Sequence, residues 1–295
     1  MSELLLSKLI KEYEIIDAVS FENEQPISVF ARMTSNVNEK KCVFLQQSKY
    51  IKDIDKHVSM IITTPELRNL ISKESVGFCF TDSPRGLFFE IMSKYEKTID
   101  DSMSETLIGH NCSISKTAVI APNGVVIGDN VTIGDYVVIH PGTTIGSNVT
   151  IQTGARIGEQ DFNLYTFRGN TKQLYHSGRV QIGSNVLISS GVLIGRALYS
   201  YGVTAIGDNC FIGANVGIGH NSIIEDNCEI CANTALGGYC EIGQNSKLYM
   251  SVTVANALKI GANATINVGS VVIRNVKEGK TLFGNPAREI VSPKA

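Results

Sequence analysis

Histidine is the side chain best suited to acid–base chemistry near neutral pH, and this chain has five histidines. An unperturbed imidazole titrates at about pH 6.5, so it can accept a proton during a reaction and return it afterwards. His220 lies in the stretch Ile218-Gly-His-Asn-Ser-Ile-Ile224, within the most regular part of the sequence. A lone surface histidine is more often inert than functional, so the elements that position His220 decide whether it can act.

Those elements follow a period of six residues. From Ile182 to Val272, fifteen of the sixteen positions spaced six apart are aliphatic, and Ser200 is the exception. A second series, from Ile127 to Ile157, keeps the same step upstream. A fixed short period of this kind indicates a β-helix, in which each repeat adds one short strand.

The other positions of the repeat agree with short strands joined by tight corners. A small or slender residue follows each aliphatic by four positions, as at Val216, Ser222 and Cys228. Asn or Gly often stands between them, and both residue types tolerate the positive φ of sharp turns. An α-helix is excluded because a six-residue step drifts around a helix of 3.6 residues per turn. His220 occupies an outward position of its hexad.

The repeated string aliphatic-Gly-x-x-small-x resembles the hexapeptide-repeat acyltransferases. The resemblance implies a mainly β fold, a left-handed parallel β-helix, although crossovers between parallel strands are usually right-handed. In that fold three hexads form one triangular coil of eighteen residues, so Gly238 would lie one coil beyond His220.

The resemblance also implies catalytic roles for these two residues. The string Gly-His-Asn-x-x-Ile is similar to the catalytic histidine segment of sugar acyltransferases in this group, where the histidine is the general base for an attacking amine. A general base contributes roughly 10²–10⁴-fold to a rate. Gly238 would donate its backbone N–H to a thioester carbonyl, a contact typically worth about 3 kcal/mol. An inert histidine and a corner glycine remain the alternative interpretation.

Residues 1–105 lack the six-residue period and predict a small α/β domain. Short buried strands are expected at 42–45, 60–63 and 77–80. Helices are expected at 4–13, 65–72 and 84–95, the last two opened by a proline in the first turn. The polar stretch 96–105 is the expected linker to the β-helix of residues 106–276.

One segment of this domain resembles the N-terminal domain of the UDP-3-O-acylglucosamine N-acyltransferases. Phe44 ends a predicted strand, and Tyr50 follows it in the run Gln47-Ser-Lys-Tyr. In that family two such aromatics hold the uracil ring of a nucleotide sugar by stacking. Phe44, Tyr50 and Gln47 are therefore expected to bind substrate, although the family usually has Asn-Pro-Lys-Tyr at this place. A core Phe44 and a half-exposed Tyr50 are the alternative.

Between Ile157 and Ile182 the repeat is interrupted by a stretch rich in aromatic and basic residues. An interruption of this length is typical of a functional loop, so a loop is predicted at 158–181. The same acyltransferase family has a loop here that ends in Gly-Arg-Val, as in Gly178-Arg179-Val180. His176 and Arg179 are expected to contact substrate, and His176 could instead orient the neighbouring base.

The C-terminal end differs from that family. A second histidine of the family is replaced at the matching position by Ala257, and C-terminal helices that engage acyl carrier protein have no counterpart. The segment 277–295, the predicted tail, contains Gly284-Asn-Pro-Ala-Arg288, which resembles the ending of acetyl-CoA-dependent sugar acetyltransferases. Gly284, Asn285, Pro286 and Arg288 are therefore expected to lie near the acyl donor.

Composition limits the possible partners. A net charge of −2 in 295 residues provides no basic surface for nucleic acid, and no apolar run is long enough to span a membrane. A cytoplasmic location is expected, with reduced cysteines that pack inward at Cys112, Cys210, Cys228 and Cys240. The pair Cys228-x-x-Cys231 lacks the second pair or histidines of a zinc site, so no metal is expected.

These observations predict an N-acyltransferase that moves an acyl group from a thioester to the amine of a nucleotide-linked amino sugar, for lipopolysaccharide, O-antigen or a related surface glycan. Acyl-CoA is the favoured donor and acyl carrier protein the alternative, with no tightly bound cofactor. The resemblance implies a homotrimer. Alternatives are the lipid A enzyme UDP-3-O-(3-hydroxyacyl)glucosamine N-acyltransferase and a non-catalytic solenoid that binds or scaffolds. A carbonic-anhydrase-like trimer is disfavoured because His110, His140 and His220 do not form a zinc cluster.

Overall fold

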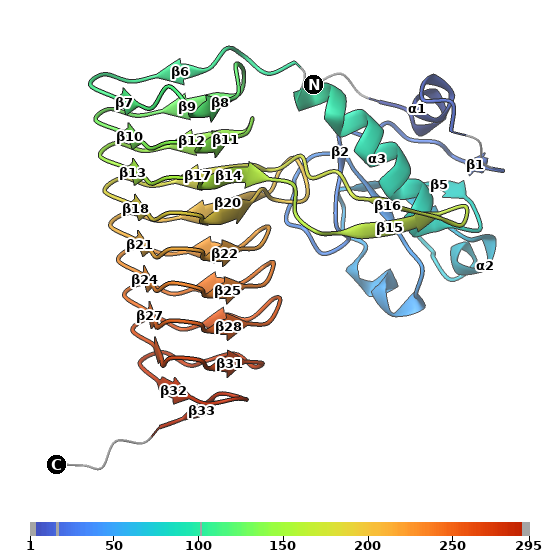
Figure 1. Cartoon of the computed structure of the whole chain (residues 1–295). Coiled ribbons are helices and arrows are strands. Elements are labelled where there is room, and N and C mark those ends of the chain that lie inside the picture. Colours follow the sequence, from blue (N-terminus) through green and yellow to red (C-terminus); the bar gives the residue numbers. More distant parts are fainter. Residues whose placement is uncertain (1–3, 16–17, 101, 291–295) are drawn as a thin grey trace. The chain divides into compact units, whose positions relative to one another are not determined.

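The computed structural model describes residues 4–15, 18–100 and 102–290. The chain divides into two compact units (Figure 1). One contains the N-terminal residues to 101 together with residues 162–175. The other contains residues 102–161 and the chain from 176 onward. The chain therefore passes from one unit to the other three times.

The N-terminal unit is built on a five-stranded sheet of order β1-β5-β4-β3-β2, parallel except for β1. Its strands are β1 (Ser20–Glu22), β2 (Val29–Phe30), β3 (Lys41–Phe44), β4 (Val58–Thr63) and β5 (Gly77–Phe80). Its helices are α1 (Leu6–Glu12), the 3₁₀ helix η1 (Ser48–Asp53), α2 (Pro65–Arg68) and α3 (Pro84–Asp100). The predicted strands and helices of this region are all present, with shifted ends.

Two helix ends differ from the prediction. Helix α2 stops at Arg68 rather than residue 72, because Asn69 and Leu70 are not buried and provide no apolar face to continue it. Helix α3 continues to Asp100, through part of the stretch expected to be a linker. Glu96 and Asp100 are buried at its C-terminal end, so polar composition misled the prediction there.

The second unit is a solenoid of short parallel strands stacked coil on coil (Figure 1). Three sheets form its faces. The first contains β6 (Leu107–Ile108), β9 (Val125–Ile127), β12 (Thr143–Ile145), β17 (Arg179–Ile182), β20 (Val203–Ile206), β23 (Ile223–Ile224), β26 (Glu241–Ile242) and β29 (Lys259–Ile260). The second contains β7 (Ser113–Ile114), β10 (Thr132–Ile133), β13 (Thr150–Ile151), β18 (Leu187–Ile188), β21 (Phe211–Ile212), β24 (Glu229–Ile230), β27 (Lys247–Leu248), β30 (Thr265–Ile266), β32 (Thr281–Phe283) and β33 (Arg288–Glu289). The third contains β8 (Val119–Ile120), β11 (Val138–Ile139), β14 (Arg156–Glu159), β19 (Leu193–Gly195), β22 (Gly217–Ile218), β25 (Ala235–Leu236), β28 (Thr253–Val254) and β31 (Val271–Val272).

The six-residue period is the period of this core. Ile212, Ile218 and Ile224 end successive strands, one on each face, and all three are buried. Between them, Asn215 and Asn221 hold the corners with φ of +56° and +58°, a conformation that asparagine tolerates. Equivalent residues on neighbouring coils are eighteen apart in the regular part, as in the pairing of Ile218 with Leu236.

Two interruptions break this spacing. Ile194 pairs with Ile218, twenty-four residues on, because residues 196–202 form an extra loop at one corner. The exceptional Ser200 lies in that loop and is not part of the core series. Ile157 pairs with Ile194, thirty-seven residues on, and this excursion contains the hairpin of β15 (Leu164–Phe167) and β16 (Asn170–Gln173). The predicted loop at 158–181 is thus largely an ordered hairpin, grouped with the N-terminal unit.

The last strands continue the second face inside the segment predicted as a tail. Thr281 and Leu282 of β32 pair in parallel with β30, and β33 folds back on β32 in antiparallel fashion. The turn between β32 and β33 contains a cis bond between Asn285 and Pro286.

Candidate active site

His220 lies at the corner that follows β22. Ile218 anchors the strand in the core, and Asn221 turns the chain immediately after the histidine with φ +58°. Asn221 is itself held, because its backbone N–H donates to Thr204 Oγ1 and its Oδ1 accepts from the N–H of Leu198. The side chain of His220 is 13% exposed, so its predicted outward position is a partly covered one.

Asp161 fixes the orientation of this imidazole. One carboxylate oxygen, Oδ2, lies 2.6 Å from Nδ1 of His220 and also accepts the backbone N–H of His220 at 2.9 Å. An ionised carboxylate can only accept, so Nδ1 carries the proton and Nε2 is the unprotonated nitrogen. This is the tautomer that a general base acting through Nε2 requires.

Gly238 lies one coil beyond His220, against the ring. A Cβ placed on Gly238 would stand 2.5 Å from Cε1 and 2.8 Å from each ring nitrogen of His220, closer than such atoms approach. Only glycine fits this position without moving the imidazole. The N–H of Gly238 donates to no backbone oxygen that the structure describes, so it is available to an incoming acceptor. Gly238 therefore stacks on His220 as the eighteen-residue coil predicts.

Two aromatic edges flank the imidazole. His176 meets it at a ring-centroid distance of 5.1 Å and an interplanar angle of 81°, and Tyr239 at 5.2 Å and 86°. Tyr239 has φ +62°, an uncommon conformation for a bulky residue, at the corner that Asn221 occupies one coil earlier. The imidazole of His220 therefore has little freedom to rotate.

His176 is completely buried. Its backbone exchanges two hydrogen bonds with the amide side chain of Gln160, and its Nδ1 lies 3.2 Å from the carbonyl oxygen of Arg196. Burial lowers the pKa of His176 to about 4, so the ring is neutral at pH 7. This side chain has no exposed surface, and its ring edge lies against His220.

Arg196 holds the two residues that follow His176 in the chain. Its guanidinium is buried and donates from Nε to the carbonyl of Gly178 at 2.9 Å and from Nη2 to that of Ser177 at 3.0 Å. Its neighbour Gly195 lies close to His220 as well. A Cβ added at Gly195 would stand 3.4 Å from both Asp161 and the backbone nitrogen of His220.

The sequence provided no signal for Asp161, Arg196 or Tyr239. Asp161 is 59 positions from His220, across an interruption of the repeat. Arg179, expected to contact substrate, lies exposed on β17, and the described contacts of His220 are made by other residues.

The predicted nucleobase residues all belong to the N-terminal unit. Phe44 is partly exposed at the end of β3 and packs against Phe88 and Phe89 of α3 at centroid distances of 5.2 and 5.6 Å. Tyr50 lies in η1, 42% exposed, with Nζ of Lys49 4.8 Å from its ring centroid. Gln47 precedes η1 and is exposed. Within the part of the chain that the structure describes, no ring contact joins Phe44 to Tyr50.

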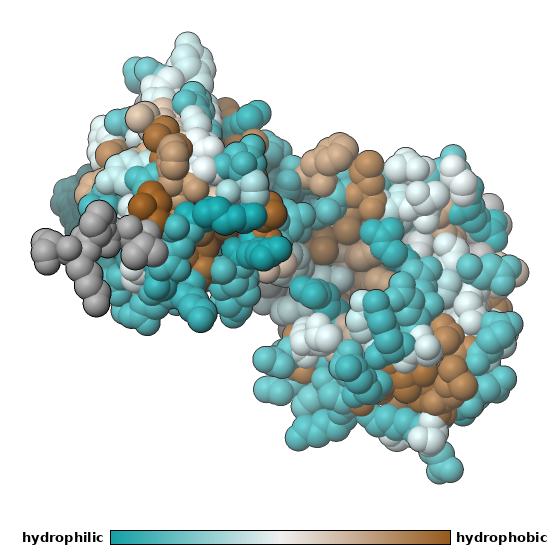
Figure 2. Space-filling view, turned by 90° about the horizontal axis from the view of Figure 1, so that it is seen from below, coloured by the Kyte–Doolittle hydropathy of each residue, from teal (hydrophilic) through white to brown (hydrophobic). Residues whose placement is uncertain are grey.

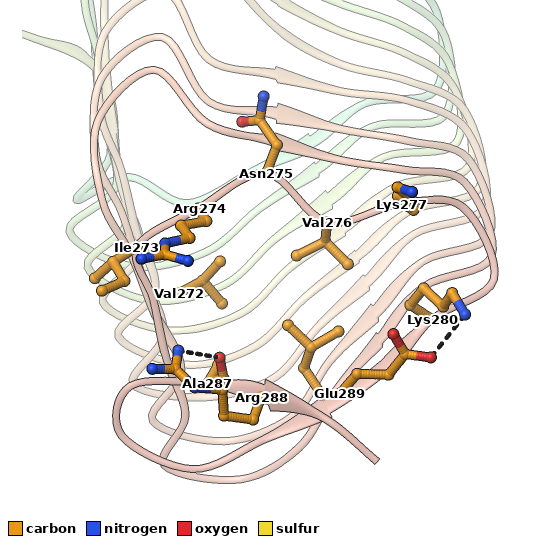
Figure 3. A pocket seen from close by; sticks show the side chains of 11 residues that line it. Val272, Ile273, Arg274, Asn275, Val276, Lys277, Lys280, Ala287, Arg288 and Glu289 are labelled. Carbon is orange, nitrogen blue, oxygen red and sulfur yellow. Dashed lines mark hydrogen bonds and ion pairs between the residues drawn. The ribbon is translucent and has the colours of Figure 1, made fainter. Parts of the chain in front are cut away.

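A cavity of about 480 Å³ opens at the C-terminal end of the solenoid (Figure 3). Val272, Val276 and Leu282 give it apolar walls. Viewed from this end, hydrophobic side chains lie among hydrophilic ones (Figure 2).

Basic side chains surround this cavity. They are Arg274, Lys277, Lys280 and Arg288, and Lys280 is paired with Glu289 at 2.6 Å. Arg288 is therefore at the cavity, as a donor-binding residue would be. Gly284, Asn285 and Pro286 form the turn beside it and are not among the lining residues.

The cysteines have packing roles. Cys210, Cys228 and Cys240 are buried in the solenoid core, whereas Cys112 is only partly buried. The thiol of Cys228 donates to the carbonyl of Gly243 at 3.2 Å. Over residues 4–15, 18–100 and 102–290, no cluster of three or more His, Cys, Asp or Glu side chains could hold a metal ion.

Sequence families match three segments of the chain. Residues 124–159 and 204–238 match the family described as bacterial transferase hexapeptide (six repeats), and residues 105–134 match the hexapeptide repeat of succinyl-transferase. The chain therefore contains hexapeptide repeats in these segments. The predicted resemblance to the hexapeptide-repeat acyltransferases is confirmed in these segments, and so is the predicted left-handed parallel β-helix. One matched segment contains both His220 and Gly238.

Curated relatives carry one name, UDP-3-O-acylglucosamine N-acyltransferase. That of Rickettsia canadensis is 35% identical over 101 residues, which are 34% of this chain and 24% of the relative. That of Maricaulis maris is 42% identical over 77 residues, 24% of this chain and 22% of the relative. The matched part thus spans about a quarter of the length of these relatives.

Solved structures resemble the chain over a larger part of its length. LpxA from Acinetobacter baumannii is 26% identical, with 62% of this chain and 73% of that chain covered and a TM-score of 0.46. A perosamine N-acetyltransferase variant from Caulobacter crescentus, solved in complex with CoA and GDP-perosamine, is 16% identical, with 80% and 70% covered and a TM-score of 0.31. Among the described residues of the present chain, no helix is long and apolar enough to cross a membrane.

Proposed function

We propose that this protein is an N-acyltransferase that joins an acyl group from a thioester to the amine of a nucleotide-linked amino sugar. The observation that supports this most strongly is the arrangement at one corner of the solenoid. His220 has Nδ1 on Asp161, and the backbone of Gly238 lies so close to its ring that a side chain would not fit there. A base and an oxyanion donor in contact are the two groups that acyl transfer requires when the acyl group arrives already activated.

The proposed reaction needs no enzyme nucleophile. The substrate amine attacks the thioester carbonyl while Nε2 of His220 accepts its proton, and Asp161 stabilises the imidazolium that forms. The N–H of Gly238 donates to the carbonyl oxygen as negative charge develops there. Collapse of the tetrahedral intermediate forms the amide, breaks the C–S bond and returns the proton from His220 to the departing thiolate.

The nucleotide sugar would be bound by the N-terminal unit. Phe44 is held by Phe88 and Phe89, so it could present a rigid aromatic edge or face, and Tyr50 has enough exposure to stack on a base. Because the relatives of the chain are named for a UDP-sugar substrate, a uridine nucleotide is the first choice. Such an enzyme would act in the cytoplasm, and we propose that it forms a homotrimer.

Acyl-CoA is the proposed donor. CoA carries a pyrophosphate and a further phosphate, and the cavity at the end of the solenoid combines apolar walls with Arg274, Lys277 and Arg288. Arg274 is three coils beyond His220 in sequence, about 14 Å along a solenoid whose coils are about 4.8 Å apart. A pantetheine arm could cover this distance, with its thioester at the base.

The donor proposal predicts a charge-dependent KM. The double substitution Lys277→Ala with Arg288→Ala should raise the KM for acyl-CoA roughly 3- to 10-fold with little change in kcat, and the effect should weaken in high salt. Lys247→Ala, which removes a lysine from β27 away from the cavity, is the control. An unchanged KM in the double variant would remove the phosphates of CoA from this site.

Transfer from acyl carrier protein in the lipid A pathway is the second candidate, favoured by the names of the curated relatives. The deciding experiment is mass spectrometry of products. The purified protein is incubated with UDP- and dTDP-amino sugars and with acetyl, hydroxybutyryl and longer hydroxyacyl thioesters on CoA and on carrier protein. A mass gain with CoA supports the proposal, and a gain with carrier protein alone selects the lipid A reaction. No gain with any pair would favour a non-catalytic solenoid.

A further inference from the structure

The hairpin of β15 and β16 belongs to the N-terminal unit, although the chain on either side of it belongs to the solenoid. Residues 162–175 belong to the N-terminal unit, whereas the residues directly before and after them, Asp161 and His176, belong to the solenoid. Those two flanking residues are the ones that contact His220. The segment that contains the hairpin is therefore joined directly, at each end, to a residue that contacts His220.

Glu90 of α3 is the principal anchor of the hairpin inside the N-terminal unit. Its carboxylate is 6% exposed and accepts hydrogen bonds from Tyr165 Oη at 2.8 Å and from Lys172 Nζ at 2.8 and 3.0 Å. Tyr165 is on β15 and Lys172 on β16, and both strands lie beside α3 (Figure 1). One carboxylate therefore joins both strands to the helix.

The charge of Glu90 is retained in this environment. Burial alone would raise the pKa of its carboxyl, but the hydrogen bonds from Lys172 and Tyr165, with the positive charges of Lys172 and Lys94, lower the pKa overall. A largely buried carboxylate that is fully hydrogen-bonded holds its partners firmly, because removing its charge leaves the lysine contact uncompensated.

Further contacts keep the hairpin close to α3. Gly86 packs so tightly on the hairpin that an added Cβ would lie 2.6 Å from the carbonyl oxygen of Thr166. Arg85 donates to the carbonyl of Leu164 at 3.2 Å, and Tyr175 donates its hydroxyl to Asp100 at 2.6 Å. The hairpin is therefore secured along its length.

At the solenoid side, the ends of the excursion are tied together. The backbone N–H of His176 donates to Oε1 of Gln160 at 2.8 Å, and Nε2 of Gln160 donates to the carbonyl of His176 at 3.0 Å. Asp161 stands between this clamp and the first residue of the hairpin. The backbone of Asp161 is thus attached on one side to Gln160 of the solenoid and on the other side to the hairpin segment, which is bonded to α3.

We propose that Glu90 is a positioning residue for His220, acting through the hairpin and Asp161. The proposal rests on the proposed acyl transfer, in which Asp161 fixes the tautomer of the base. Loss of the Glu90 contacts would loosen both strands of the hairpin, although Arg85 and Tyr175 would still hold its ends. Asp161 could then leave Nδ1, so that the base would be misoriented for part of the time. The chemical step should slow, while binding of the nucleotide sugar should change little.

A double-mutant cycle tests this route. We expect Glu90→Gln to lower kcat about 10-fold and to change the KM for the nucleotide sugar less than 3-fold. Asp161→Asn alone should lower kcat further, and adding Glu90→Gln to it should have less than a 2-fold effect, because the two residues act through the same contact. Glu22→Gln is the matched control, since it breaks the ion pair of Glu22 with Arg68 in the same unit without touching the hairpin. Additive losses, or an unchanged kcat in Glu90→Gln, would overturn the proposal.

A spectroscopic measurement separates this proposal from the proposed function. In protein labelled with ¹⁵N-histidine, the Nδ1–H proton of His220 should resonate at low field because it is bonded to a carboxylate, and Asp161→Asn identifies the signal by removing it. We expect Glu90→Gln, and independently Lys172→Met from the hairpin side, to broaden or abolish that signal, with Glu22→Gln leaving it intact. A persistent sharp signal in both folded variants would refute the positioning role, even if no substrate pair were ever turned over.

Discussion

The chemistry of single residues here depends on how little space surrounds the imidazole of His220. Asp161 takes Nδ1, His176 and Tyr239 present ring edges, and Gly238 covers the ring with backbone alone. Each neighbour limits the rotamers open to the imidazole, which in the proposed reaction would keep Nε2 directed at the substrate amine. Preorganisation of this kind lowers the reorganisation required at the moment of reaction.

Gly238→Ala tests the close approach at this ring. The new methyl would be within 2.8 Å of three ring atoms of His220, so the imidazole must turn away from Asp161 or the coil must shift. We expect kcat for acyl transfer to fall at least 10-fold. Gly217→Ala is the control, because a Cβ there meets no atom within 4 Å, and it should keep both activity and thermal stability. Equal activities of the two variants would contradict the packing role of Gly238.

His176 should make the stability of the solenoid depend on pH. The pKa of His176 is about 4 in the folded protein, because of burial, against about 6.5 in an unfolded chain. Between these values the unfolded state binds a proton that the folded state does not, so this residue lowers the free energy of unfolding as pH falls from about 6.5 to about 4. Asp161, His220 and Arg196 are the charged or titratable groups that act on it.

The measurement compares wild type with His176→Gln by urea unfolding at several pH values from about 7 to about 4. The wild type should lose more stability than the variant over this range, so the difference between the two free energies of unfolding should narrow toward the acid end. Parallel curves would show that the folded and unfolded states bind a proton at His176 alike, so that burial does not lower the pKa of this ring.

The sequence was informative about His220, the proposed base, but not about its partner Asp161. His220 and Gly238 could be related because a regular solenoid turns sequence spacing into spatial distance. Asp161 and His176 could not be related to them in this way. The hairpin between Asp161 and His176 interrupts the six-residue repeat, and the repeat does not predict where the hairpin packs. The extra loop at 196–202 hid Arg196 for the same reason.

At the scale of elements, the hexad pattern alone explains the solenoid. Each aliphatic position ends a strand and points inward, while the residue before it points outward, as Ile212 and Phe211 illustrate. The N-terminal helices were less well defined by pattern, because burial of Glu96 and Asp100 depends on tertiary contacts that composition does not reveal.

Ile212→Ala against Phe211→Ala tests this division. Ile212 is fully buried, so its truncation leaves a cavity and should cost about 2–5 kcal/mol of unfolding free energy. Phe211 is 54% exposed on the outer surface, and its truncation should cost less than about 1 kcal/mol despite the larger side chain removed. Thermal or urea unfolding of both variants gives the comparison, and a larger loss for Phe211→Ala would contradict the inward assignment of the hexad.

At the scale of the whole molecule, the chain connects its units at three places: after residue 101 and on either side of 162–175. Two of these crossings adjoin residues that contact His220. In the proposed enzyme, the unit that would bind the nucleotide and the coil that would perform the chemistry are thus covalently joined next to the base. The proposed reaction depends on His220 acting as that base.

The most direct test is the rate of acyl transfer by His220→Ala, measured beside binding of the nucleotide sugar by calorimetry. We expect kcat to fall roughly 10²- to 10⁴-fold, while the affinity for the nucleotide sugar and the fold are retained. His110→Ala, at a side chain that is 91% exposed, should behave as wild type. A folded His220→Ala protein that transfers acyl groups within a few-fold of the wild-type rate would contradict the assignment of His220 as the general base.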